Sequence, residues 1–113
     1  MKASELRIGN LVDSPRGIES ISDAESLQEI ESYPEKFKPI PLTEEWLLKF
    51  GFEIDNGLDK RYRKENDHIE VGLRYIKSIK VFKLGFIGTE IKYVHQLQNL
   101  YFALTGEELI INL

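Results

Sequence analysis

The sequence predicts a small α+β protein in which an antiparallel β-sheet packs against a short helix at about residues 43–50 and a C-terminal helix at about residues 94–105. Three observations support this fold class. Apolar residues recur with helical spacing near the C-terminus, helix-capping signals surround residues 43–50, and residues 52–93 contain alternating apolar and polar runs. A chain of 113 residues is expected to form a single domain over residues 1–113, with one core.

The C-terminal helix has an apolar face made of Val94, Leu97, Leu100, Tyr101 and Leu104, followed by a glycine at the expected helix end. The opposite face carries His95, Gln98 and Asn99, with Phe102 among them. Because an apolar ring is costly to leave in water, we expect this polar face to be an interface. The sequence leaves open whether a second layer of the same chain, a partner protein or a second copy covers it.

The short helix is predicted by signals at both of its ends. Thr43 is a suitable N-cap, and Leu42 and Leu47 have the spacing of a hydrophobic staple. Gly51 provides the left-handed residue after the helix, and Phe52 is placed to complete a Schellman ending. All of these signals agree on the same boundaries.

Strands are expected on either side of an Asn56-Gly57 hairpin turn and further along the chain, at about residues 52–55, 60–64, 68–75, 79–84 and 87–93. Near the N-terminus, residues 6–12 and 18–21 are expected to form a hairpin across a Pro- and Gly-containing turn. Residues 109–111 are expected to add a last short strand. Residues 22–33 fit either a short helix or an acidic edge strand, and we favour a strand or irregular segment for a reason given below.

Composition excludes several classes of protein. There are no cysteines, so disulfides and thiolate metal sites are excluded, and the chain fits a reducing, cytoplasmic setting. No apolar run reaches the roughly 20 residues of a membrane span, and no signal peptide is expected. The net charge is −4, yet residues 59–94 carry 9 basic against 5 acidic side chains. This segment is either ordinary solvated surface or a basic face for an anionic partner.

Two long motifs resemble a known group of proteins. They are KPIPLTEEWLLKFGF at residues 38–52 and YVHQLQNLYFALTGEEL at residues 93–109. Together with residues 6–10, they resemble a family of small uncharacterised proteins found in bacterial genomes, phages and prophages. The resemblance implies a phage or mobile-element setting and an N-terminal region made of strands, which is why we favour a strand at residues 22–33. It implies no activity, cofactor or catalytic residue.

No catalytic or metal-binding constellation stands out in the sequence. The two histidines, His68 and His95, lack metal-ligand spacing, and no nucleophile, base and orienting group occur together. We therefore expect a non-enzymatic protein-interaction or accessory protein without a cofactor, which acts on an unknown protein partner or as a homo-oligomer. The alternative is a single-stranded nucleic-acid-binding module that uses seven basic residues near aromatic ones, namely Lys60, Arg61, Arg63, Lys64, Arg74, Lys80 and Lys83. Strand alternation argues against it, because Tyr62 is expected to face away from Arg61 and Arg63.

Overall fold

A computed structural model describes residues 1–56, 60–65, 69–77, 80–85 and 88–111. Its main element is a five-stranded sheet in which consecutive strands pair antiparallel in the order β3-β4-β5-β6-β7. The strands are β3 (Glu53–Asn56), β4 (Lys60–Glu65), β5 (Glu70–Ile76), β6 (Val81–Leu84) and β7 (Thr89–Ile91). The α+β class and the antiparallel sheet within residues 52–93 are therefore confirmed. Gly57 and His68 lie outside the described residues.

The N-terminal part forms a smaller unit of its own. A hairpin pairs β1 (Leu11–Ser14) with β2 (Gly17–Ser20), and α1 (Ala24–Ser32) follows it. Two short 3-10 helices, η1 (Ala3–Glu5) and η2 (Pro34–Lys36), complete the unit.

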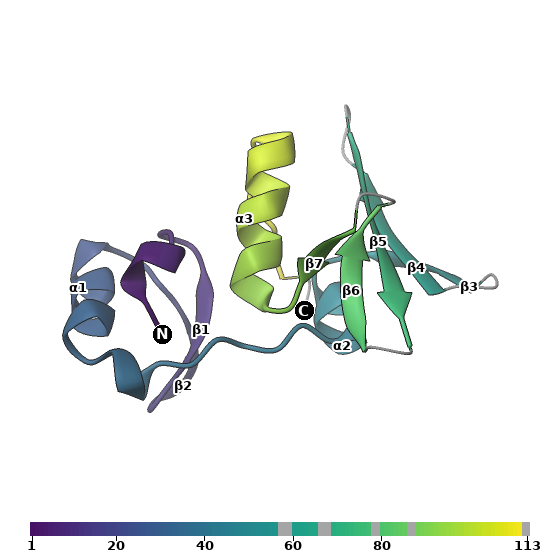
Figure 1. The fold of residues 1–113 in the computed structure, drawn as a ribbon. Helices are drawn as coiled ribbons and strands as arrows, with labels where there is room; N and C mark the ends of the chain where they lie inside the picture. Colours follow the sequence, from purple (N-terminus) through teal and green to yellow (C-terminus); the bar gives the residue numbers. More distant parts are fainter. Residues whose placement is uncertain (57–59, 66–68, 78–79, 86–87, 112–113) are drawn as a thin grey trace.

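The helix α3 (Val94–Thr105) stands between these two parts of the molecule. Figure 1 shows the N-terminal elements on one side of α3 and the five-stranded sheet on the other. The second helix, α2 (Glu44–Lys49), lies on the same side of the sheet as α3. No helix in the described part of the chain covers the opposite, outer face of the sheet.

The buried residues form two hydrophobic clusters, a large one and a small one. The larger cluster joins the inner face of the sheet to α2 and to the apolar side of α3, where Leu97 is fully buried. The smaller cluster contains Val12, Ile21, Ile30 and Phe37 of the N-terminal unit. Polar contacts join the N-terminal unit to α3, as described below.

The capping signals of α2 are confirmed. Thr43 Oγ1 accepts a hydrogen bond from the Trp46 amide at 3.4 Å. At the other end, Gly51 has φ +85°, and the Phe52 amide donates to the Leu47 carbonyl at 3.0 Å. The Gly51 amide donates to the Leu48 carbonyl, also at 3.0 Å, which completes the Schellman ending.

Residues 22–33 are helical over most of their length, so the preference for a strand is wrong. Asp23 caps α1 by accepting a hydrogen bond from the Ser26 amide at 2.9 Å. Ile30 and Leu27 then place their side chains in the smaller cluster. Capping and helical spacing thus prevail over the resemblance, which implies strands in this region.

Two further strand predictions need correction. Residues 6–10 are not part of the first strand, because Gly9 has φ +101° and Asn10 Oδ1 accepts from the Arg7 amide at 2.7 Å, which forms a turn. Residues 109–111 form no strand; Leu109 is instead buried in the larger cluster. Among the described residues, none of the helices is long and apolar enough to cross a membrane.

Candidate functional site

The polar face of α3 is covered by the chain itself. Gln98 Oε1 accepts a hydrogen bond from the Leu11 amide at 2.8 Å, and Gln98 Nε2 donates to the Gly9 carbonyl at 3.2 Å. Asn99 Oδ1 accepts from Asn10 Nδ2 at 2.8 Å and from Arg7 Nε at 3.1 Å. A second layer of the same chain, one of the alternatives that the sequence left open, therefore covers Gln98 and Asn99.

The four residues predicted as an interface therefore have separate surroundings. His95 and Gln98 are each only 2% exposed within the chain, so their side chains offer little surface to a partner. Phe102 stays 40% exposed, and the Arg7 guanidinium lies 4.4 Å from its ring centroid. Arg7 also pairs with Glu108, which fixes the cation over the ring. The polar partners of Gln98 and Asn99 come from residues 5–11, which tertiary packing brings to α3.

The seven basic residues predicted for nucleic acid do not form one surface. Arg61, Arg63, Arg74 and Lys83 occupy the outer face of the sheet, because cross-strand partners share a face. Lys60 and Lys64 belong to the inner face with Tyr62, and Lys64 Nζ donates to the Phe50 carbonyl at 2.8 Å. The expected separation of Tyr62 from Arg61 and Arg63 is confirmed, since Tyr62 is buried and both arginines are exposed.

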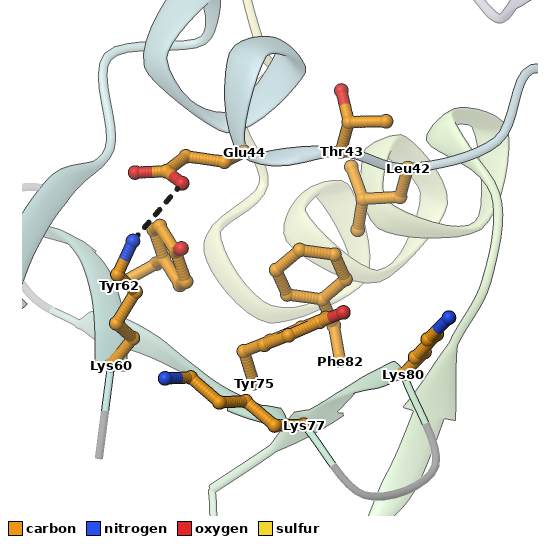
Figure 2. Close-up of a pocket in the computed structure, with 9 residues that line it drawn as sticks. All are labelled: Leu42, Thr43, Glu44, Lys60, Tyr62, Tyr75, Lys77, Lys80 and Phe82. Carbon is orange, nitrogen blue, oxygen red and sulfur yellow. Dashed lines mark hydrogen bonds and ion pairs between the residues drawn. The ribbon is translucent and has the colours of Figure 1, made fainter.

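A pocket opens at the edge of the inner face, beside the start of α2, with a volume of about 310 Å³. Its lining residues come from the segment before α2, from α2 itself and from the strands and turn of the sheet: Leu42, Thr43, Glu44, Lys60, Tyr62, Tyr75, Lys77, Lys80 and Phe82. Figure 2 shows Lys60 and Lys77 on one side of the Tyr75 ring and Lys80 on the other. The pocket thus combines an aromatic wall with a cationic rim.

The aromatic wall is a packed cluster. The Tyr75 and Phe82 ring centroids lie 4.9 Å apart, and those of Tyr62 and Phe82 lie 5.6 Å apart with the rings edge to face. Burial, assisted by the nearby Glu44 carboxylate, raises the pKa of Tyr62 to about 12. The Tyr62 hydroxyl therefore stays protonated at neutral pH, and Tyr75 is the partly exposed ring that a ligand can reach.

The cationic rim is only partly neutralised by the protein. Lys60 Nζ lies 3.4 Å from Glu44 Oε2. Lys77 and Lys80 are exposed and have no carboxylate partner among the residues that the structure describes. Three cations against one carboxylate make this pocket a basic site in a chain of net charge −4.

The turn before β6 holds Lys80 in an uncommon backbone conformation. Its φ is +54°, the left-handed region that costs a residue with a Cβ atom about 1–2 kcal/mol. Glycine is the residue that adopts this conformation without the steric cost. A lysine at this position therefore lowers the folding stability relative to glycine, but it places a cation at the rim of the pocket.

Two pocket residues could have been found by strand periodicity alone. Lys60 precedes Tyr62 by two positions, and Lys77 follows Tyr75 by two, so each lysine shares its tyrosine's face. Of the three lysines that line the pocket, Lys60 and Lys80 are among the basic residues predicted to bind nucleic acid, and Lys77 is not. Glu44, from α2, has no such signal, because its approach to Lys60 depends on how α2 packs against the sheet.

The chain is a small α+β protein with a basic, aromatic-walled pocket. Within the described residues, no group of three His, Cys, Asp or Glu side chains is placed to hold a metal ion. Comparison of the chain with protein-family models, with curated proteins and with solved structures finds no match.

Proposed function

We propose that this chain is a non-enzymatic interaction protein that holds an acidic segment of a partner protein in the lysine-rimmed pocket. The supporting observation is the pairing of a partly exposed Tyr75 ring with two lysines, Lys77 and Lys80, that lack a carboxylate partner in the described structure. Lysine ammonium groups attract carboxylates, while the apolar wall accepts the aliphatic or aromatic part of a peptide.

A peptide fits this site better than a nucleic-acid strand. The predicted basic residues lie on two opposite faces of the sheet, so a strand that follows one face cannot contact the others. The net charge of −4 also repels a long polyanion at a distance. The resemblance to phage and prophage proteins supports an accessory role in the cytoplasm of a bacterial host, with a protein as the target.

Two substitutions test the pocket without endangering the fold. Lys77→Gln removes one exposed cation, and Lys80→Gly removes another while it relieves the left-handed backbone, so Lys80→Gly should not lower the melting temperature. A short fluorescein-labelled peptide of glutamates ending in phenylalanine is the probe. At low salt each variant should weaken its binding by about two- to fivefold, as expected for partly exposed charge pairs. Fluorescence anisotropy measures the affinity.

Lys38→Gln is the matched control, because Lys38 is exposed and lies outside the pocket. Equal weakening by Lys38→Gln would show that only net charge matters, and the pocket would not be the site. Binding of an oligothymidylate in preference to the peptide, with a steep salt dependence, would instead support the nucleic-acid alternative. Light scattering of the unliganded protein reports whether a second copy occupies the pocket.

A further inference from the structure

The outer face of the sheet, on the side opposite the lysine-rimmed pocket, carries a row of cations. The register places Arg74 of β5 directly opposite Arg61 of β4 and opposite Lys83 of β6. Like charges at directly opposed positions destabilise a sheet. Arg61 faces Asp55 of β3 and Lys83 faces Glu90 of β7, so Arg74 is the member of the row whose two cross-strand neighbours are both cations.

A cavity of about 310 Å³ is lined by Arg61 and Arg74 of this row and by Arg63 beside them. Gly72 lines it opposite Arg63, and a Cβ atom built on Gly72 meets no heavy atom within 4 Å. Arg74 Nε is buried and has no hydrogen-bond partner in the described structure. A buried donor without an acceptor is costly, and the edge of a guanidinium formed by Nε and Nη matches two oxygens of a phosphate.

Acidic residues surround the cations and limit the size of the anion. The row ends in Asp55 on β3 and in Glu90 on β7, and Glu70 also lines the cavity. A long polyanion that crosses the sheet must pass these carboxylates, whereas a compact anion over the central strands avoids them. We propose that this cavity binds a compact phosphate group, which Arg74 and Arg61 hold while Gly72 leaves room for its oxygens.

Isothermal titration with sodium pyrophosphate at low ionic strength tests the site. Arg74→Gln should weaken binding about tenfold or more, because a hydrogen bond to a charged group is lost. Gly72→Val keeps the charge but fills the cavity, so it should abolish binding. The open space at Gly72 lets the sheet accept valine, and its melting temperature should be unchanged or raised. Gly72→Ala provides a smaller change if valine does not fold.

Lys38→Gln is the charge control, because Lys38 is exposed and does not line this cavity. This variant should leave the affinity for pyrophosphate within about twofold of the unaltered protein. Absence of pyrophosphate binding, or binding that Arg74→Gln and Gly72→Val leave unchanged, would overturn the proposal. Tighter binding of a short oligothymidylate than of pyrophosphate would overturn the inference of a compact ligand. Because the lysine-rimmed pocket is on the other face, Gly72→Val should leave peptide binding there unchanged.

Discussion

The two long sides of α3 hold their neighbours by different physical means. Toward the sheet, Val94, Leu97 and Tyr101 are at most 2% exposed and pack in the larger apolar cluster. Toward the N-terminal unit, Gln98 and Asn99 instead make directed hydrogen bonds to residues 5–11. Apolar packing stabilises in proportion to the area buried, whereas each buried polar group must meet its partner or incur the cost of desolvation. The polar side therefore fixes the alignment of the N-terminal unit more than it adds stability.

The largest effect should come from the apolar side. Leu97→Ala removes a fully buried side chain between α3 and the sheet and should lower the free energy of unfolding by about 2–5 kcal/mol. Urea denaturation measures the change. Leu104→Ala, on the same helix but 40% exposed, should cost far less. Equal losses in the two variants would show that the side of α3 facing the sheet is not the main apolar contact.

A smaller and more local effect should come from the polar side. Gln98→Leu leaves the Leu11 amide and the Gly9 carbonyl without their partner, and should cost roughly 1–3 kcal/mol. The same change at the exposed Gln28 is the control and should be near neutral. Hydrogen exchange should show faster exchange at the Leu11 amide while the sheet amides keep their protection. Uniformly faster exchange would contradict a separate role for the polar side.

The smallest effect should be a pH dependence through His95, which lies on the polar side. Burial lowers the pKa of His95, and the Glu5 carboxylate opposes this shift more weakly. Because the folded pKa lies below the unfolded value of about 6.5, the unfolded chain binds the extra proton as the pH falls. The stability present above about pH 6.5 should therefore decline toward lower pH.

Urea unfolding at a series of pH values around neutrality measures this decline, and His95→Gln should make the profile flatter. His68→Gln is the matched control because it removes the other histidine of the chain. A profile that changes with His68→Gln and not with His95→Gln would contradict the assignment of the pH dependence to His95.

Local signals were enough for the elements whose stabilising contacts are close in sequence. The helix α2 is set by Thr43 and Gly51 at its two ends, and the sheet strands follow from the alternation of buried residues such as Val71 and Leu73. The helix α1 also has local sequence signals. Asp23 is a suitable N-cap, and Leu27 and Ile30 are spaced so that both lie on one face of a helix. The error there came from placing the resemblance above the capping and packing pattern.

The sequence by itself determined the α+β class, α2, the antiparallel strands and the apolar face of α3, because each depends on contacts or periodicities within a few residues. Only the tertiary structure decided what covers the polar face of α3, since Leu11 and Gln98 are 87 positions apart. It also decided which cations act together: register places Arg74 between Arg61 and Lys83, and the packing of α2 brings Glu44 to Lys60. Such contacts depend on strand register and on how the helices pack. Both are set by the whole molecule and cannot be predicted from a short stretch of sequence.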